Sequence, residues 1–268
     1  MSSSLAVAQY LPYLRRYARA LTGNQGSGDA YVVATLEALL KVPDVLTETV
    51  PPRVALFRMF TTIWNSVPIN GVADAPGGGG GAIDRRLSQI TPRPRQAFLL
   101  ISLEGFSESE ASEILGVDIA TLRRLVDDAG REMASEIATS VLIIEDEMLI
   151  AMDLETLVES LGHRVAGTAR TRAEATALAK AGRPGLVLAD IQLADGSSGL
   201  DAVNDMLDTF EVPVIFITAY PERFLTGERP EPAFLIAKPF QPAMVSAVIS
   251  QALFFERNAV RRDRRAAS

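Results

Sequence analysis

The 268-residue sequence contains no cysteine and one histidine, His163. Without cysteine there can be no disulfide, no thiolate nucleophile and no zinc site built from cysteine ligands. No uncharged apolar run approaches the roughly 20 residues that a membrane span needs. The first residues, MSSSLAVAQYLPYLRR, also lack the basic segment and apolar run of a secretion signal. We therefore expect a cytoplasmic protein without membrane contact. His163 stands at the start of an expected strand, away from the acidic strand ends, so we expect it to have a structural role.

Basic residues are also scarce. Lysine and arginine total 26 against 33 acids, which gives a net charge of −7. This balance weighs against attraction of the whole protein to nucleic acid, although a local basic patch is still compatible with it. A chain of 268 residues suggests two domains or three small ones, and a hydrophobic fraction of 48% is enough to form their cores.

The composition divides the chain in two places. NGVADAPGGGGG (70–81) contains five consecutive glycines, which are typical of a flexible linker. Near residue 138, helical periodicity gives way to VLII, a run typical of a buried parallel strand. We predict a helical domain at 1–69, a linker at 70–82, a second helical domain at 83–137, an α/β domain at 138–258 and a solvated tail at 259–268.

Residues 107–134 have the pattern of a helix-turn-helix. SESE (107–110) is a capping box in which Ser107 caps a helix and Glu110 bonds back to it. Gly116 ends that helix and Asp118 caps the next one. A short helix, a glycine turn and a second helix make up the helix-turn-helix motif. The second helix has an apolar stripe that we expect to face the core: Ile119, Leu122, Leu125, Val126 and Met133.

The second helix of this motif has acids where DNA would lie. Arg123 and Arg124 are followed by Asp127 and Asp128, which can form ion pairs at spacing i, i+4. Between residues 104 and 136 there are three basic residues and nine acids, so three minus nine gives −6. Because affinity for duplex DNA depends largely on lysine and arginine, this charge disfavours DNA binding.

Strands and helices alternate after residue 140. The expected strands are 141–145, 163–168, 185–190, 213–217 and 233–237, with helices near 148–161, 171–181, 199–209 and 241–257. Such alternation predicts a doubly wound α/β fold, a parallel sheet with helices on both faces. Sites in these folds lie at the carboxyl ends of the strands.

Polar residues stand at four of those strand ends. EDE (145–147) follows the first strand, Asp190 ends the third, Thr218 follows the fourth and Lys238 follows the fifth. Clustered carboxylates resist ionisation unless a cation joins them, and Mg²⁺ suits oxygen ligands. Mg²⁺ also binds phosphoryl oxygens, a carboxylate can attack phosphorus, and lysine pairs with phosphate.

The motifs IIEDE, LVLADIQL, FITA and AKPF, in this order, resemble a response-regulator receiver domain over residues 140–257. The resemblance implies that Asp190 is the phosphoacceptor and that the domain binds Mg²⁺. Asp146 would be a direct metal ligand, Glu145 a ligand through water, and Gln192 a ligand through its backbone carbonyl. Two further side chains would contact the phosphoryl group: Thr218 and Lys238.

Two features depart from an ordinary receiver. Tyr220 closely follows Thr218 and is either a surface aromatic or part of the switch. PERFLTGERPEP (221–232) leaves room for barely two helical turns, so we expect a remodelled face around the fourth and fifth strands. Glu147 lies one step beyond the acidic pair and could instead be a helix acid favoured by the helix dipole.

The helical half resembles extracytoplasmic-function sigma factors. LTGNQGSGDAYVVATLEALL (21–40) is similar to their region 2, and residues 91–125 are similar to region 4. Together, the two halves resemble PhyR-type response regulators of the alphaproteobacterial general stress response.

That resemblance implies partner switching by a monomeric protein that is not an enzyme beyond the phosphoryl chemistry at Asp190. A histidine kinase or phosphotransferase would supply the phosphoryl group. Phosphorylation would free the sigma-like half to capture an anti-sigma factor. One alternative is a DNA-binding regulator or a working sigma factor gated by the receiver. Another is a phosphate shuttle whose helical half is inert.

Overall fold

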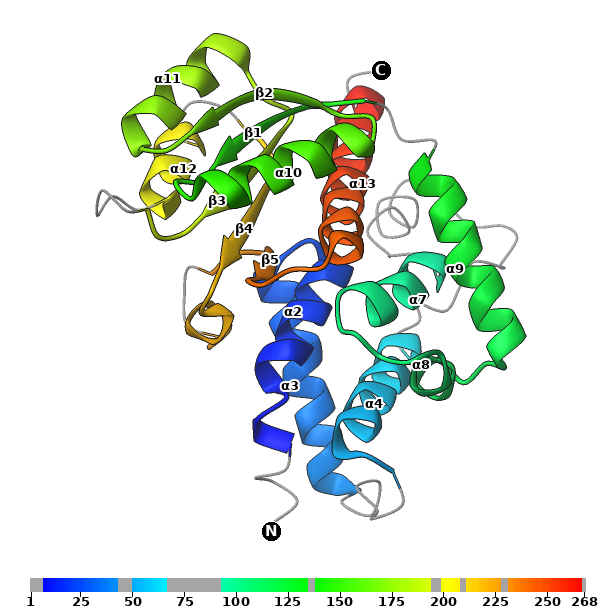
Figure 1. The fold of residues 1–268 in the computed structure, drawn as a ribbon. Helices are drawn as coiled ribbons and strands as arrows, with labels where there is room; N and C mark the ends of the chain where they lie inside the picture. The colour runs from blue at the N-terminus through cyan, green and yellow to red at the C-terminus, as the bar shows by residue number, and fades with distance from the viewer. Residues whose placement is uncertain are drawn as a thin grey trace.

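The computed structural model describes residues 7–42, 50–66, 93–134, 138–193, 199–207, 211–227 and 231–266. The predicted glycine-rich linker lies outside these ranges. Figure 1 shows a helical half and a sheet-containing half, with the long helix α13 (Pro242–Ala266) between them.

The first helical unit consists of α2 (Leu11–Thr22), α3 (Gln25–Lys41) and α4 (Pro52–Ser66). Helix α2 ends at Gly23, whose φ of 65° lies in the left-handed region that favours glycine. Asn24 then caps α3 by accepting a hydrogen bond from the backbone of Ser27. Trp64 is buried and its ring lies 4.8 Å from that of Tyr31, so this tryptophan belongs to the core.

The second unit contains α7 (Arg93–Ser102), α8 (Glu108–Leu115) and α9 (Ile119–Ala134), and it confirms the predicted helix-turn-helix. Both bonds of the capping box between Ser107 and Glu110 are present. Gly116 ends α8 with a φ of 63°. Asp118 caps α9 by accepting a 2.6 Å hydrogen bond from the backbone of Thr121.

The apolar stripe of α9 is only partly as predicted. Leu122 is fully buried, and Leu125 and Val126 pack against the core. Ile119 is 42% exposed, so its prediction as a core residue is wrong. It is the first residue of α9 and lies between two exposed neighbours, Asp118 and Ala120. The side chain of Met133 lies outside the described residues.

The predicted ion pairs within α9 are also wrong. Arg123 instead contacts Glu108 of α8 at 2.7 Å, and Arg124 donates to the hydroxyl of Thr121 at 3.1 Å. Asp128 pairs with Arg131. Long side chains on a helix point toward its N-terminus, so these arginines point away from acids that lie one turn later. Arg123 is therefore paired with an acid, although not with the one predicted.

The second half has the predicted doubly wound α/β fold. Its strands are β1 (Ser140–Ile144), β2 (Arg164–Ala169), β3 (Leu186–Asp190), β4 (Val214–Thr218) and β5 (Phe234–Ala237). They pair in parallel in the order β2-β1-β3-β4-β5. Helices α10 (Met148–Ser160) and α13 cover one face. Helices α11 (Arg172–Gly182) and α12 (Gly199–Leu207) cover the other. His163 is buried beside β2, and its Nδ1 accepts a hydrogen bond from the backbone of Thr139.

Two segments differ from an ordinary doubly wound domain. Between β4 and β5, the described residues contain only a 3-10 turn, η2 (Pro221–Phe224), in agreement with the shortened helix expected there. At the other end, α13 continues to Ala266. The backbone of residues 259–266 is therefore helical, whereas a tail was predicted.

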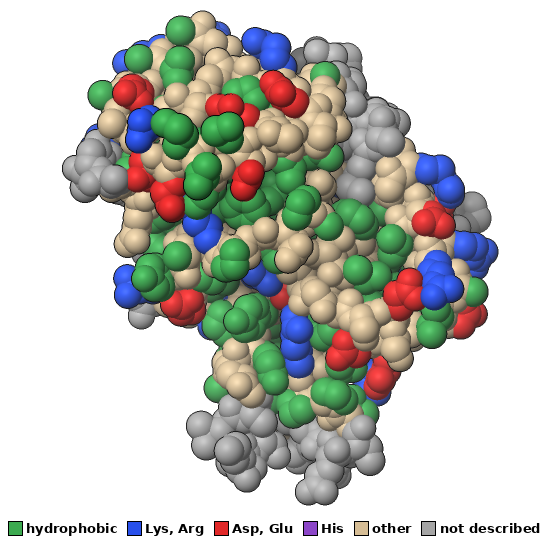
Figure 2. All heavy atoms as spheres, in the orientation of Figure 1, with side chains coloured by type: hydrophobic (Ala, Val, Ile, Leu, Met, Phe, Trp, Pro, Cys, Tyr) green, Lys and Arg blue, Asp and Glu red, His purple; other side chains and the backbone are tan. Residues whose placement is uncertain are grey.

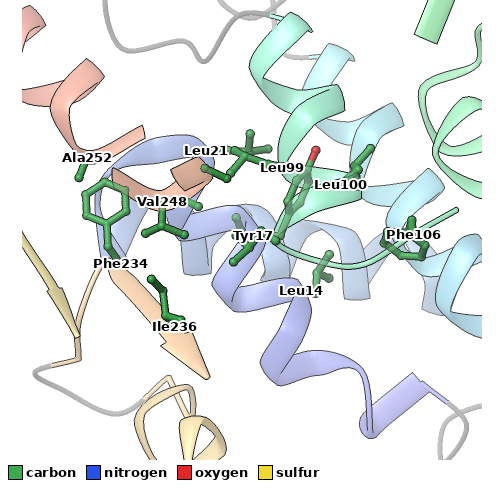
Figure 3. Close-up of a cluster of buried hydrophobic side chains, with 14 of the residues drawn as sticks. Leu14, Tyr17, Leu21, Leu99, Leu100, Phe106, Phe234, Ile236, Val248 and Ala252 are labelled. Carbon is green, nitrogen blue, oxygen red and sulfur yellow. The ribbon is translucent and has the colours of Figure 1, made fainter. Parts of the chain in front are cut away.

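The two halves share one hydrophobic core. Helix α13 packs on α2 and α7, and β5 packs on α2. Figure 3 shows this cluster, in which leucines and a tyrosine from the helical half meet apolar side chains of β5 and α13. The labelled residues are Leu14, Tyr17, Leu21, Leu99, Leu100, Phe106, Phe234, Ile236, Val248 and Ala252.

Candidate functional site

The carboxyl edge of the sheet brings a lysine together with three acids. The Nζ of Lys238 lies 2.7 Å from a carboxylate oxygen of Asp190 and 2.9 Å from one of Glu145. Glu147 lies at 3.5 Å from the same nitrogen. Asp190 and Glu145 are both buried. These are the residues expected at the ends of β1, β3 and β5, and they form one compact charged site.

The site changes the proton affinity of its members. Burial raises the pKa of Glu145, although the neighbouring Lys238 opposes this shift. Burial alone would lower the pKa of Lys238, but hydrogen bonds to Asp190 and Glu145 outweigh it, so that pKa is raised. The lysine therefore stays charged at neutral pH and can pair with an anionic group.

The oxygen-rich site fits a hard divalent cation. Carboxylate oxygens of Glu145, Glu147 and Asp190 lie within 4.8 Å of one another. The Oε2 of Glu145 is buried and lies 2.9 Å from the Nζ of Lys238 as an ion-pair partner. Such an oxygen suits Mg²⁺.

Only some of the predicted metal ligands lie in the carboxylate cluster. Within the described part of the chain, Asp146 is not a member of the carboxylate cluster, whereas Glu147 is. The backbone carbonyl of Asp146 accepts a 3.2 Å hydrogen bond from Arg170, a residue that sequence reasoning missed. The backbone N–H of Gln192 donates to Asp190 at 3.0 Å. The ligand roles of Asp146 and Gln192 therefore stay predictions.

Thr218 and Tyr220 differ in their surroundings. Thr218 is buried, and its hydroxyl accepts a 3.2 Å hydrogen bond from the backbone of Tyr220. Its carbonyl accepts a 2.8 Å hydrogen bond from the backbone of Lys238, which joins β4 to the lysine of the site. The side chain of Tyr220 is 45% exposed and lies against Arg223, whose guanidinium is 4.6 Å from the ring centre. In this conformation Tyr220 is a surface aromatic.

Gly199 holds the backbone of the site in place. Its N–H donates to the carbonyl of Ile191 at 3.1 Å, and a Cβ at this position would overlap the carbonyl oxygen of Asp190. We expect Gly199→Ala to destabilise the sheet-containing half by roughly 1–3 kcal/mol, as overpacking does. Urea unfolding monitored by circular dichroism would measure the loss.

The matched control for this prediction is Gly182→Ala at the end of α11, where a Cβ would meet nothing within 4 Å. This change should leave stability unchanged or raise it slightly. Equal stability of Gly199→Ala and Gly182→Ala would contradict the close approach.

A buried arginine joins the segment after β4 to the helical half. Arg19 of α2 is fully buried and contacts Glu231 at 2.6 Å and Asp29 of its own half at 2.8 Å. It also donates to the carbonyl of Phe224 at 3.3 Å. Arg15 donates to the carbonyl of Leu225 at 3.2 Å. The remodelled face around β4 and β5 is therefore the face that covers α2.

A second buried arginine joins the two halves at α13. Arg95 of α7 is 3% exposed and donates to the hydroxyl of Ser250 at 2.8 Å. It also pairs with Glu132 of α9 at 3.2 Å. In the opposite direction, the side chain of Gln251 on α13 donates to the carbonyl of Ala20 on α2 at 2.9 Å. Sequence reasoning missed these contacts because nothing local marks them.

Known proteins share this arrangement of a helical half and a sheet-containing half. Family models match residues 7–61 as the Sigma2 domain of PhyR, 87–136 as the sigma-like domain of the response regulator PhyR, and 141–250 as a response regulator receiver domain. The chain is 67% identical to the phyllosphere-induced regulator PhyR of Methylorubrum extorquens over 98% of both sequences. The chain belongs to the PhyR family of response regulators.

Solved structures of this family resemble the whole chain. The crystal structure of the anti-anti-sigma factor PhyR from Bartonella quintana is 52% identical, with a TM-score of 0.86 over 97% of this chain and 99% of that one. A co-crystal structure of the same Bartonella protein with the anti-sigma factor NepR is 52% identical over 95% of this chain and 100% of that one, with a TM-score of 0.42. None of the described helices of the present PhyR-family chain is long and apolar enough to cross a membrane.

Proposed function

We propose that this protein is a phosphorylation-gated mimic of a sigma factor that captures an anti-sigma factor and thereby releases a stress sigma factor. The observation that carries the proposal is the buried contact of Arg19 with Glu231, through which the receiver covers the sigma-like half. The name anti-anti-sigma factor of the Bartonella relative supports it, as does that protein's complex with NepR.

Asp190 is the phosphoacceptor in this proposal. A carboxylate oxygen of Asp190 attacks phosphorus in a phosphohistidine or small acyl phosphate and forms a P–O bond. The bond between phosphorus and the donor breaks, and the donor leaves with its electron pair. Lys238, already 2.7 Å from Asp190, pairs with the phosphoryl group. Thr218 offers its hydroxyl as a hydrogen-bond donor.

Magnesium would neutralise charge on the phosphoryl oxygens when bound. We propose Asp190, Asp146 and the carbonyl of Gln192 as its ligands, with Glu145 acting through water. The position of Glu147 in the carboxylate cluster makes it a further oxygen donor beside them.

Phosphorylation reaches the interface through β4 and β5. When Thr218 turns toward the phosphoryl group, it gives up the hydrogen bond from the backbone of Tyr220. Six residues after Thr218, the carbonyl of Phe224 accepts from Arg19 of the sigma-like half. A change at Asp190 can therefore weaken the interdomain contact, which makes the contact between halves a two-state element biased by charge.

The rival function, DNA binding, is disfavoured by the surface of α8 and α9. Figure 2 shows acidic side chains interspersed with basic ones over these helices, with no continuous basic surface on this face. Arg58 pairs with Glu113 at 2.9 Å, and Arg123 with Glu108 at 2.7 Å. Both arginines are paired with acids of the same half, which reduces the positive charge that they present to phosphates.

We expect no sequence-selective duplex binding by the phosphorylated protein. Fluorescence anisotropy at about 50 mM salt, where electrostatic binding is enhanced, would measure it. The double variant Asp127→Lys, Asp128→Lys is the control, because four added charge units should produce measurable non-specific binding. Tight, sequence-selective binding by the wild-type protein would contradict the proposed function.

The other rival, a phosphate shuttle with an inert helical half, predicts no partner for the sigma-like half. Pull-down of NepR with the phosphorylated protein separates the two ideas. Capture of NepR supports the sigma mimic, and its absence supports the shuttle.

A further inference from the structure

An arginine that follows β2 lies beside the acids that follow β1. The two strands pair in parallel, with Ile144 opposite Ala169. The backbone N–H of Glu145 donates to the carbonyl of Ala169 at 2.9 Å, so the strand ends are joined where the acids begin. Arg170 is the next residue of the chain, and it is exposed. The pairing of β1 with β2 therefore places Arg170 beside the acidic turn, which we define as residues 145–147.

The side chain of Arg170 holds one peptide group of the acidic turn. Its guanidinium donates to the carbonyl of Asp146 at 3.2 Å. The N–H of the same peptide group belongs to Glu147 and donates to the carboxylate of Glu145 at 3.3 Å. Because a peptide group is planar, bonds to both of its polar atoms fix its orientation. That orientation sets ψ of Asp146 and φ of Glu147, and with them the directions in which the two side chains leave the backbone.

Arg170 is itself held by the start of α11. Its backbone N–H donates to the carboxylate of Glu174 at 2.8 Å. The backbone N–H of Glu174 donates in turn to the hydroxyl of Thr171, the N-cap of α11, at 3.3 Å. These two bonds tie the first turn of α11 to the residue before its cap, in the manner of a capping box. The guanidinium of Arg170 therefore reaches the acidic turn from a backbone that is fixed by hydrogen bonds.

We propose that Arg170 is a positioning residue for the divalent cation of the receiver site. By holding the carbonyl of Asp146, it limits the directions available to the carboxylates of Asp146 and Glu147 and so raises the affinity of the site for Mg²⁺. This inference rests on the proposed function, in which both residues supply oxygen to the cation. Residues that orient metal ligands without touching the metal typically change its affinity roughly 10- to 100-fold when they are removed.

The charge of Arg170 acts in the opposite direction to its hydrogen bond. A positive group beside the site repels Mg²⁺, so removal of the charge alone would strengthen cation binding. Because Arg170 is exposed, salt screens this repulsion, and the Debye length is about 8 Å at physiological ionic strength. The orientation of the acidic turn depends much less on salt. Loss of the hydrogen bond should therefore outweigh loss of the charge, and removal of the side chain should weaken Mg²⁺ binding.

The test is an NMR titration of the unphosphorylated full-length protein with Mg²⁺ at about 0.15 M salt, followed through the amide signals of the acidic turn. We expect Arg170→Ala to weaken Mg²⁺ binding roughly three- to tenfold, at the low end of such effects because Arg170 is exposed. The matched control is Arg164→Ala at the other end of β2. Arg164 is also exposed and also donates to an oxygen of β1, the hydroxyl of Ser140, at 3.2 Å. This control should bind Mg²⁺ as the wild type does.

A second measurement separates positioning from a general loss of structure. In phosphorylation by acetyl phosphate, Arg170→Ala should need roughly three- to tenfold more Mg²⁺ for its half-maximal rate. It should reach the wild-type rate when Mg²⁺ is saturating, because Asp190 and Lys238 are unchanged. A rate that saturating Mg²⁺ does not restore would overturn the inference, since Arg170 would then act on the fold or on the phosphoryl transfer.

Mg²⁺ binding by Arg170→Ala that is as tight as that of the wild type, or tighter, would overturn the inference and leave the proposed function intact. An equal loss in Arg170→Ala and Arg164→Ala would also overturn it, because the effect would not depend on the contact with Asp146. Absence of Mg²⁺ binding by the wild type would instead contradict the metal site of the proposed function itself.

Discussion

Glu231→Ala should let the unphosphorylated protein bind NepR roughly 10- to 100-fold more tightly than the wild type does. The substitution removes a hydrogen bond between charged groups that holds the two halves together, and such a bond contributes about 1.5–3 kcal/mol. Glu231 contacts the fully buried Arg19 at 2.6 Å and accepts hydrogen bonds from the backbone of Thr226 and Gly227. Removing the Glu231 carboxylate therefore weakens the interface and also removes the hydrogen bonds that order the segment after β4. Arg19 keeps Asp29 as a partner, so the sigma-like half itself should remain folded.

The pKa of Glu231 indicates when this contact is present. Burial acts to raise this pKa, but hydrogen bonds from Thr226 and Arg19 outweigh burial, so the pKa is lowered. Because this pKa is lowered, the stabilisation that ionised Glu231 provides is complete above the ordinary pKa of a glutamate. It is lost only as pH falls through the lowered pKa. Glu231 is therefore ionised at neutral pH, and its contact with Arg19 contributes fully there.

Calorimetric titration at neutral pH would measure the effect of Glu231→Ala. The matched control is Glu222→Ala, an exposed glutamate of η2 in the same segment. This control should bind as weakly as the unphosphorylated wild type. Equal affinities for Glu231→Ala and Glu222→Ala would show that the Arg19–Glu231 contact does not hold the two halves closed.

Asp190→Ala should abolish the gain in NepR affinity that acetyl phosphate and Mg²⁺ produce in the wild type. The variant lacks the carboxylate that would accept the phosphoryl group, and Lys238 loses its 2.7 Å partner. We expect at least a tenfold difference between phosphorylated wild type and treated variant, about 1.4 kcal/mol. Mass spectrometry of the intact protein would report phosphorylation, and calorimetry would report binding.

Asp153→Ala is the control for this prediction, because Asp153 is an exposed acid on α10, the helix that follows Glu147, and is not a member of the carboxylate cluster found among the described residues. It should be phosphorylated and should respond as the wild type does. If Asp190→Ala still gained affinity with acetyl phosphate, the phosphoacceptor would have to be assigned elsewhere.

The sheet and its site could be predicted because their signals are local. Strand ends in a parallel sheet meet at one edge, so Glu145, Asp190 and Lys238 could be brought together from their positions after apolar runs. The capping box and Gly116 fixed the helix-turn-helix in the same way, since each depends on residues three or four positions apart.

The interface could not be predicted because its partners are distant in sequence. Arg19 and Glu231 are separated by 212 residues, and Arg95 and Ser250 by 155. Arg123 shows the same limit at shorter range: its sequence neighbours suggested Asp127, but packing of α9 on α8 placed Glu108 beside it. Burial of an arginine depends on which surfaces meet, and a single sequence does not contain that information in any local pattern.

The most direct measurement is a calorimetric titration of the wild-type protein with NepR, with and without acetyl phosphate and Mg²⁺. Our account predicts weak binding without phosphate and at least about tenfold tighter binding with it, equivalent to about 1.4 kcal/mol. The same affinity in both states would contradict the claim that phosphorylation frees the sigma-like half.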